Sequence, residues 1–147
     1  LAPPAPAAQP TQKARLEEAA KGRASDPAHL AGARIYSGAC AVCHEPGQGA
    51  PMFGVKPSLA LNTALHADAP DTALRVILEG FRAPPGLEQL GAMPGFARYL
   101  DDAQLADLAA YLRARFAPGR PPWSRLAERA AHLRRQILTG GGAGINH

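Results

Sequence analysis

The stretch Cys40-Ala41-Val42-Cys43-His44 shapes every expectation for this chain of 147 residues. It places two cysteines three positions apart, with a histidine directly after the second. At this spacing two thiols can each bond one vinyl group of a haem, while the histidine lies beneath the iron as an axial ligand. The motif therefore predicts one covalently bound haem c, with Cys40 and Cys43 as attachment points and His44 as an iron ligand.

Other uses of a cysteine pair fit the rest of the sequence poorly. A thioredoxin-like dithiol expects a surrounding βαβ pattern, and the segments around the motif are not rich in strand-forming residues. A zinc site needs a second pair of ligands at suitable spacing, and the chain has only two cysteines. A disulfide across the motif would close a very short loop and constrain little chain entropy. Haem attachment is therefore the preferred interpretation.

The composition favours a single small domain built around a cofactor. The chain is 46% hydrophobic, yet it has only four Phe, three Tyr and one Trp, so its own side chains would make a thin core. A haem would supply a large flat apolar body around which helices can close. The sequence shows no run of about 20 apolar residues of the kind that spans a membrane.

The formal net charge is +4 at pH 7, and positive charge is concentrated toward the C-terminus. Residues 113–135 hold one acidic residue, Glu128, and seven arginines: Arg113, Arg115, Arg120, Arg125, Arg129, Arg134 and Arg135. Such a run indicates first a solvated helix face and second a surface that docks an acidic partner. Binding of nucleic acid is not expected beside a haem motif.

Proline, glycine and charge divide the chain into three parts. Residues 1–24 are expected to form a Pro/Ala-rich linker or extension, in which 13–23 either form a short exposed helix or become ordered against a partner. Residues 25–117 are expected to form the haem-binding domain. Residues 118–147 are expected to add a C-terminal extension with one helix and a Gly-rich tail. Both extensions are expected to be flexible.

The spacing of apolar residues and the capping residues predict an all-α fold without a convincing strand. Asp26 and Pro27 suit the first turn of a helix that runs into Cys40. Asp101, with Gln104 three residues later, forms the pattern of a capping box. Further helices are expected at 62–67, 71–79, 102–116 and 125–138. Loops rich in Pro and Gly are expected at 45–61 and 81–95.

Three residues predict how the first helix of the domain packs. Gly32 and Tyr36 lie one helical turn apart, and Tyr111 lies on the helix that follows Met93. A glycine permits a close crossing of two helices, and an aromatic ring can fill the notch beside it. We therefore expect the two helices to cross beside the haem edge.

The sixth iron ligand must be a methionine or a histidine, and the candidates are Met52, Met93, His29, His66, His132 and His147. Met52 follows His44 so closely that its loop leaves on the same side of the haem. Met93 comes after an intervening helix that can carry the chain to the opposite face, and Pro94 restricts it to an extended backbone. We expect Met93 as the ligand, with a gap-filling core methionine as the alternative. His66 is the leading histidine alternative.

The second ring nitrogen of His44 needs an acceptor that fixes the orientation of the imidazole. A backbone carbonyl in the next loop is the natural candidate. Pro57 either supplies a turn that passes beneath the haem or only stiffens the loop, and the residues alone leave both alternatives open.

Methionine ligation would raise the reduction potential relative to a second histidine, because a thioether favours ferrous iron. With both axial positions filled, oxygen or peroxide would find no open site at the iron. These expectations favour electron transfer over catalysis.

Taken together, the motifs make the chain resemble the class I cytochromes c. The resemblance spans about Pro27 to Phe116 and rests on four stretches: Gly32 to Tyr36, Cys40 to His44, Met93-Pro94-Gly95-Phe96, and Leu105 to Arg113. It implies that residues 25–117 are a cytochrome c domain with the all-α class I cytochrome c fold and one haem.

Within that class the chain is similar to the cytochrome subunits of bacterial periplasmic or membrane-associated dehydrogenases. Examples are alcohol and gluconate dehydrogenases and the molybdenum hydroxylases related to nicotinate and isoquinoline oxidoreductases. The similarity rests on Ile35 to Cys40, Lys56 to Asn62, Val76 to Gly80, Met93 to Phe96, and Trp123 to Arg134. It implies that the Pro57 carbonyl accepts the hydrogen bond of His44. It also implies a non-catalytic electron carrier between a dehydrogenase of flavin, quinone or molybdenum type and a quinone or downstream cytochrome.

Three hypotheses for the function stay open at this point. The chain is an electron-transfer subunit or domain of an oxidoreductase, a free periplasmic carrier, or a haem sensor or peroxidase in which a ligand displaces Met93. Haem attachment at this motif resembles a process outside the cytoplasm, so the periplasm is expected. The chain lacks the basic and then apolar start of a signal peptide, which suggests a mature protein or an excised domain. Membrane association through a partner or a removed anchor is compatible with this expectation.

Overall fold

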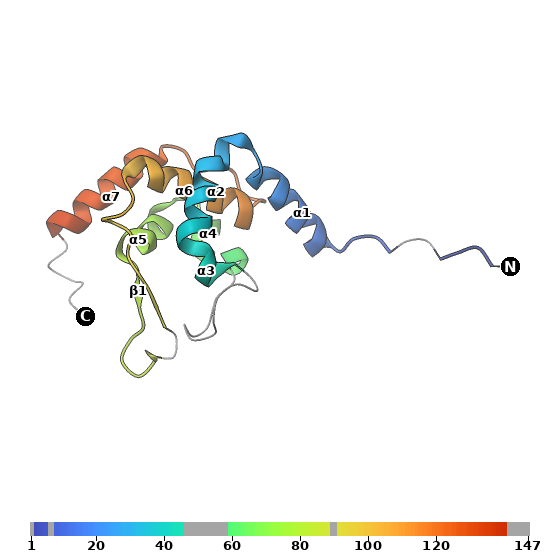
Figure 1. Ribbon diagram of the computed structural model, residues 1–147, viewed down its shortest axis with the longest axis horizontal. Helices are drawn as coiled ribbons and strands as arrows, with labels where there is room; N and C mark the ends of the chain where they lie inside the picture. The colour runs from blue at the N-terminus through green and yellow to red at the C-terminus, as the bar shows by residue number, and fades with distance from the viewer. Residues whose placement is uncertain (1, 6–7, 46–58, 89–90, 141–147) are drawn as a thin grey trace.

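The computed structural model describes residues 2–5, 8–45, 59–88 and 91–140. Within these ranges the chain is built almost entirely of helices (Figure 1). In chain order the elements are α1 (Gln12–Ala24), η1 (Pro27–His29), α2 (Leu30–Ile35), η2 (Tyr36–Cys40), α3 (Ala41–His44), η4 (Leu59–Leu61), α4 (Thr63–His66), α5 (Asp71–Glu79), β1 (Phe81–Arg82), β2 (Ala92–Met93), α6 (Asp102–Phe116) and α7 (Leu126–Gly140). The predicted helical architecture is confirmed, with the short hairpin β1–β2 as an addition.

Capping residues explain where two helical segments begin. The side chain of Asp26 accepts a hydrogen bond from the amide of Ala28 at 2.8 Å, and Pro27 opens the turn η1. From there the helical path continues through α2 and η2 to the end of α3. At the start of α6, Asp101 and Gln104 bond each other's backbone amides at 2.8 and 2.9 Å, which confirms the predicted capping box.

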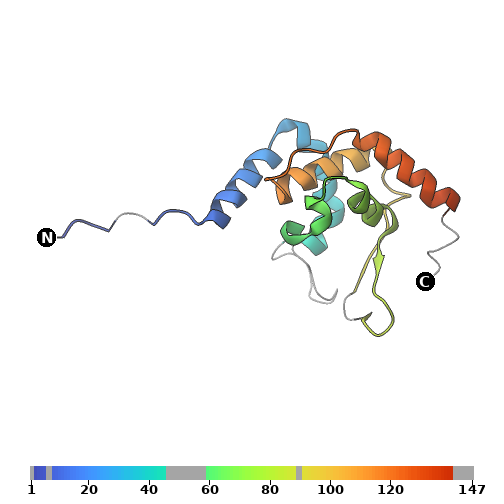
Figure 2. The same ribbon diagram turned by 180° about the vertical axis from the view of Figure 1, so that it is seen from behind.

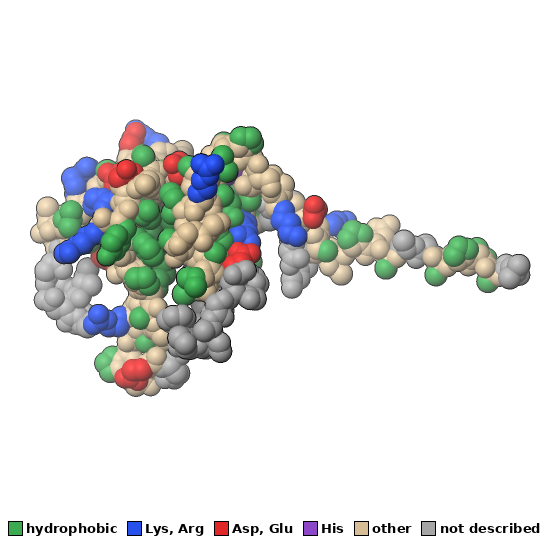
Figure 3. All heavy atoms as spheres, in the orientation of Figure 1, with side chains coloured by type: hydrophobic (Ala, Val, Ile, Leu, Met, Phe, Trp, Pro, Cys, Tyr) green, Lys and Arg blue, Asp and Glu red, His purple; other side chains and the backbone are tan. Residues whose placement is uncertain are grey.

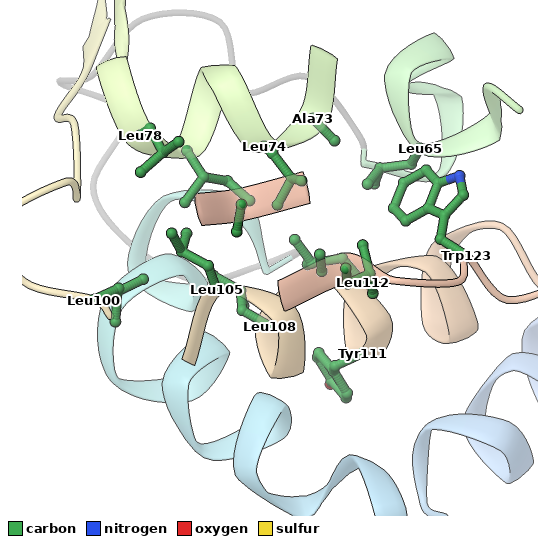
Figure 4. Close-up of a cluster of buried hydrophobic side chains, with 14 of the residues drawn as sticks. Leu65, Ala73, Leu74, Leu78, Leu100, Leu105, Leu108, Tyr111, Leu112 and Trp123 are labelled. Atoms are coloured by element: carbon green, nitrogen blue, oxygen red, sulfur yellow. The ribbon is translucent and has the colours of Figure 1, made fainter. Parts of the chain in front are cut away.

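The hydrophobic core lies where α6 meets α5 and α7. Figure 4 shows Leu74 and Leu78 of α5 pointing toward the leucines of α6. The helix α7 belongs to the same core through three buried residues: Leu126, Ala130 and Leu133. The C-terminal helix is therefore packed onto the rest of the body, while the predicted division of the chain at 24/25 and 117/118 stays a prediction.

The predicted crossing between the first helix of the domain and α6 is confirmed. Gly32 is buried where α2 meets α6, and a Cβ added to it would lie 2.7 Å from the Cβ of Tyr111 and against the backbone of Asp107. The ring centroid of Tyr36 lies 5.5 Å from that of Tyr111 and 5.8 Å from that of Phe116. This close contact fixes the segment that carries the C-x-x-C-H motif against the core.

The loop expected at 81–95 contains a short antiparallel hairpin, so the expectation that no strand would form is wrong here. Strand β1 pairs with β2, and Phe81 lies opposite Met93. Each strand has only two residues, which is too short to leave an alternation of apolar and polar residues in the sequence. Figures 1 and 2 both show the hairpin extending away from the helical body.

The expectation of a solvated arginine face at 113–135 is wrong for Arg113, which is buried, and for Arg134, which is partly buried. Arg113 is only 3% exposed, and its guanidinium donates to the carbonyls of Leu65 at 2.6 Å and Ala67 at 2.8 Å. Arg134 pairs with Asp102 at 2.9 Å and so joins α7 to the start of α6. These acceptors lie far away along the chain, and a local charge pattern therefore could not reveal them.

Residues 13–23 take the first of their two predicted forms, a helix. The hydroxyl of Thr11 caps α1 by accepting a hydrogen bond from the amide of Ala14 at 3.1 Å, and α1 packs against α6. Figure 1 shows the described residues before α1 running away from the body. The tail 141–147 lies outside the described residues. None of the described helices is long and apolar enough to cross a membrane.

Candidate haem site

A widened helical turn carries the cysteine motif. In η2 the amide of Ala41 bonds the carbonyl of Tyr36, five residues back instead of the usual four. Regular helical spacing then returns in α3, which ends at His44. Cys40, Cys43 and His44 therefore lie within the last turns of one continuous helical segment, and wide turns of this kind are frequent at functional sites.

The two cysteines are half-buried and are not joined to each other by a disulfide. Burial is the main cause that raises the pKa of the Cys40 thiol to about 11, and the neighbouring Cys43 adds to it. A redox dithiol or a zinc ligand needs an easily formed thiolate, which nearby positive charge would favour. The surroundings of Cys40 favour the neutral thiol instead, which does not suit the reactive thiolate of a redox dithiol.

The imidazole of His44 has the properties of an axial iron ligand. Burial lowers its pKa, so the neutral ring, which is the form that binds a metal, is favoured. Its Nδ1 is buried and has no hydrogen-bond partner among the described residues. Because a buried polar atom without a partner is costly, this nitrogen needs an acceptor, as the second nitrogen of a metal-bound histidine does.

One cavity brings three of the predicted site residues together. Cys40, His44 and Met93 line it, and the rest of its wall is mostly apolar: Leu59, Asn62, Ala64, Leu65, Ala73, Val76, Ile77, Phe96 and Leu112. Figure 3, in the orientation of Figure 1, shows hydrophobic side chains gathered in the area of α3 and α5. An apolar wall with one imidazole and one thioether donor suits a haem and its iron.

This cavity measures about 90 Å³. Ligand sites typically enclose roughly 300–1,000 Å³, so a porphyrin attached through Cys40 would extend beyond the described walls. A larger cavity of about 440 Å³ lies between α1, η1 and the end of α6. Arginines such as Arg23 and Arg113 line it, and neither cysteine nor methionine does, so this second cavity does not fit the haem.

The remaining ligand candidates lie elsewhere or outside the described residues. His66 does not line the haem cavity, and its Nε2 lies 2.9 Å from the carbonyl oxygen of Ala60. His29 and His132 do not line it either. Three further residues fall outside the described ranges, and the roles predicted for them stay predictions: Met52, Pro57 and His147.

Met93 is placed by backbone contacts at the end of α5. Three residues beyond it, the amide of Phe96 donates to the carbonyl of Ile77 at 2.8 Å. Gly95 lies so close to α5 that an added Cβ would be 2.6 Å from the carbonyl oxygen of Leu78. The sequence predicts a stiff Met-Pro-Gly-Phe turn. The structure shows in addition that this turn is anchored to α5, which the sequence does not reveal.

Sequence reasoning missed the polar group beside the motif. Glu45 follows His44 directly, and its carboxylate contacts the side chains of Tyr36 and Arg115. A charged residue directly after the histidine predicted as a ligand was the available signal. Its partner on α6 lies 70 positions further along the chain and could not be identified from a single sequence.

Comparison with known proteins agrees with this geometry. The family model described as "Cytochrome C oxidase, cbb3-type, subunit III" matches residues 27–112, which is more than half of the chain. The chain is 52% identical over 103 residues to a nicotinate dehydrogenase subunit of Pseudomonas putida, covering 70% of this chain and 9% of that protein. It is 34% identical over 85 residues to the cytochrome c subunit of a quinone alcohol dehydrogenase of Gluconobacter oxydans, covering 56% and 18%. It is 33% identical over 90 residues to cytochrome c6 of a Synechocystis species, covering 60% and 65%.

The chain thus spans less than a fifth of the length of these two dehydrogenase subunits and about two thirds of cytochrome c6. The matched region contains the whole C-x-x-C-H motif and Met93. Motif, cavity and relatives agree on one covalently bound haem c and on a role in electron transfer. The chain therefore belongs to the cytochrome c family represented by this family model and has the class I cytochrome c fold.

Proposed function

We propose that this cytochrome carries single electrons from the catalytic part of a dehydrogenase to a quinone or a downstream cytochrome. The observation that carries the proposal is the cavity in which Cys40, His44 and Met93 meet. Similarity to proteins named as subunits of a nicotinate dehydrogenase and of a quinone alcohol dehydrogenase supports a dehydrogenase as the donor, of flavin, quinone or molybdenum type.

We assign five residues to the haem. Cys40 and Cys43 form the thioether bonds, His44 and Met93 are the axial ligands, and the carbonyl of Pro57 accepts the hydrogen bond of His44. The buried Nδ1 of His44, which has no partner among the described residues, supports an acceptor from the undescribed segment 46–58. The position of Met93 on the cavity wall supports its role as the sixth ligand.

The haem supplies a one-electron couple of ferric and ferrous iron. The chain tunes that couple through its apolar wall, including Leu65, Val76 and Ile77, which disfavours the additional positive charge of the ferric state. The thioether of Met93 acts in the same direction. Because His44 and Met93 fill both axial positions in this assignment, no position at the iron is left for a substrate, and we propose that the chain itself is not catalytic.

We place the transfer of electrons at the surface beside the attachment motif. Val42 lies between the two cysteines and is 56% exposed, so the outer face of the motif offers an apolar contact. On the hairpin, Leu87 is 43% exposed. Transient redox complexes typically bury less than about 1,200 Å², so a small apolar patch around Val42 is enough for a brief encounter.

We propose a periplasmic location, because haem attachment at this motif resembles an extracytoplasmic process. Any association with a membrane would then come through a partner or a removed anchor. Fractionation of cells that carry the haem-stained protein tests this proposal. Recovery of the holoprotein with cytoplasmic markers would contradict it.

We also propose that residues 25–117 are the cytochrome domain, with 1–24 and 118–147 as extensions. The family match at 27–112 falls inside these bounds. A chain that begins at residue 25 should keep the absorption spectrum and potential of the full chain. A changed haem spectrum in that shortened chain would mean that α1 belongs to the domain, since α1 packs against α6.

Absorption spectra test the ligand assignment. Ligation by methionine gives a weak red band from charge transfer between sulfur and ferric iron. We expect this band in the wild type and in Met52→Ala but not in Met93→Ala. Loss of the band in Met52→Ala instead would reverse the assignment. Carbon monoxide should leave the reduced spectrum unchanged, and a new spectrum would favour a sensor or peroxidase.

The partner is tested by purification at native abundance. Co-purification with a larger flavin, quinone or molybdenum protein supports a subunit or domain of a dehydrogenase. A second candidate is a freely diffusing carrier, since the chain covers 65% of cytochrome c6 but less than a fifth of the two dehydrogenase subunits. That candidate predicts that the chain runs alone and that its electron-transfer rate depends strongly on ionic strength.

A further inference from the structure

The carboxylate of Glu45 joins the end of the haem-attachment segment to α6. Its Oε2 accepts a hydrogen bond from the hydroxyl of Tyr36 at 2.6 Å, and its Oε1 accepts one from Nη2 of Arg115. The same guanidinium donates through Nη1 to the hydroxyl of Tyr111 at 3.0 Å. Each oxygen of the carboxylate therefore has its own donor, which fixes the orientation of the Glu45 side chain.

Aromatic rings hold Arg115 in place. The guanidinium carbon lies 5.0 Å from the ring centroid of Tyr36 and 4.7 Å from that of Phe116, both within the range of cation–π contacts. The side chains of Arg115 and Glu45 are only 23% and 27% exposed. A pair at this depth is screened less by solvent than a surface ion pair. Arg115 is thus a fixed point on α6.

The cluster of Glu45, Tyr36 and Arg115 lies directly beside the end of the helical segment that carries His44. Ala41–His44 form the last turn of the continuous helical segment, and helix ends fray unless a contact holds them. At Glu45 the backbone leaves the helix, with φ −74° and ψ 128°. Tyr36 and Arg115 therefore hold the residue that directly follows His44, at the point where the helix ends.

We propose that Arg115, acting through Glu45 and together with Tyr36, is a positioning residue that fixes the orientation of the His44 imidazole toward the haem iron. This inference rests on the proposed role of His44 as an axial ligand. Groups behind a metal ligand commonly set the orientation of its ring. Here the cluster acts on the adjacent residue of the backbone, and Nδ1 of the ring is left for a separate acceptor.

Proton NMR of the oxidised, haem-loaded protein tests this proposal. The paramagnetic shifts of the haem methyl groups report the plane of the axial imidazole. We expect Arg115→Gln and Glu45→Gln to change the spread of these shifts in the same direction, because both remove the ion pair that holds residue 45. Tyr36→Phe removes one hydroxyl and keeps the ring, so it should produce a smaller change of the same sign, even where a charge variant folds poorly.

A matched control is Arg129→Gln, which breaks the pair between α7 and Asp71 on α5. The side chains of that pair are 41% and 36% exposed, and the pair lies on other elements than α3. Its loss should lower stability and leave the haem methyl shifts unchanged. A role of Arg115 in stability alone predicts the same result for Arg115→Gln, and that result would overturn the proposal.

Reduction potentials distinguish a positioning role of Arg115 and Glu45 from an effect of their charges on the haem. If Arg115 and Glu45 act only through their charges, the two glutamine variants move the potential in opposite directions and leave the methyl shifts unchanged, which would also overturn the proposal. Haem staining after denaturing electrophoresis measures covalent attachment independently. Absence of stain in the wild type would refute the proposed haem site, whereas stained variants with wild-type methyl shifts would refute only the positioning role.

Discussion

The two sides of the haem cavity are built in different ways. The segment that ends at His44 is held by tertiary packing, with Gly32 pressed against α6 and Tyr36 packed among aromatic rings. Met93 lies on a two-residue strand, and backbone contacts of the residues after it hold it to the end of α5. The histidine side therefore depends on many buried contacts, and the methionine side on a few local ones.

The two sides of the cavity should differ in local stability. Segments with few buried contacts open at a lower free energy than the core does. On the hairpin, Phe81 is 47% exposed and Leu87 is 43% exposed, whereas Tyr36 is only 2% exposed. Conditions that loosen the protein should therefore disturb the segment of Met93, the proposed sixth ligand, before they disturb the segment of His44.

The largest expected effect comes from breaking the packed side with Gly32→Ala. The added Cβ would collide with the backbone of Asp107 and the Cβ of Tyr111, so α2 and α6 would have to separate. We expect a loss of about 3 kcal/mol in the free energy of unfolding, at the upper end of the usual cost of overpacking. Denaturant unfolding of the haem-loaded protein measures this loss.

Gly38→Ala is the control for that substitution. Gly38 lies in the same helical segment, and a Cβ there would meet nothing within 4 Å. We expect this variant to be unchanged or more stable by up to about 1 kcal/mol, since alanine favours a helix over glycine. Equal destabilisation of the two variants would show that the crossing at Gly32 is not what holds the histidine side.

A smaller effect is expected from Gly95→Ala on the methionine side. The added Cβ would lie 2.6 Å from the carbonyl oxygen of Leu78, so the segment after Met93 would have to move away from α5. We expect a cost of about 2 kcal/mol, seen mainly as a weaker red band of methionine ligation at moderate denaturant. The global unfolding midpoint should change less than it does in Gly32→Ala.

The tip of the hairpin offers a control for this second prediction. At Gly86 an added Cβ meets nothing within 4 Å, although φ is +88° and strains any other residue. Gly86→Ala should cost about 1 kcal/mol from backbone strain and leave the red band intact. If it removes the band as Gly95→Ala does, the contact between Gly95 and α5 is not what positions Met93.

The sequence could predict the features that depend on local pattern. The C-x-x-C-H motif, the capping box of Asp101 and Gln104, and the stop of α5 at Gly80 each depend on residues a few positions apart. The crossing at Gly32 was also predictable, because a glycine and an aromatic one turn apart indicate a close helix contact. These features determine the helical fold and the haem side that carries His44.

Features that depend on distant partners could not be predicted. The guanidinium of Arg113 is buried because its acceptors are backbone carbonyls on and just after α4, which no charge pattern encodes. The hairpin at Met93 has strands too short to produce a period in the sequence. Likewise, Glu45 gains its importance only when the fold brings Arg115 beside it.

The smallest predicted effect concerns the hydroxyl of Tyr36. Burial, the hydrogen bond to Glu45 and the charge of that carboxylate raise the pKa of Tyr36 above its ordinary value of 10.0. Tyr36→Phe removes the hydrogen bond, which should cost about 1 kcal/mol of unfolding free energy at neutral pH. Spectra of the iron should keep the methionine band, because the Met93 side does not contact this group.

The contribution of Tyr36 to the free energy of unfolding should depend on pH in a definite direction. With the folded pKa raised, the unfolded chain loses its Tyr36 proton first, so the stability from the neutral phenol is complete below pH 10 and declines above it. This group then lowers the unfolding free energy of the wild type by up to about 1.4 kcal/mol per pH unit. The variant lacks this decline, so the two unfolding free energies should converge as the pH rises above 10. Parallel curves, measured by denaturant unfolding between pH 8 and 11, would mean that Tyr36 is not held as a neutral phenol beside Glu45.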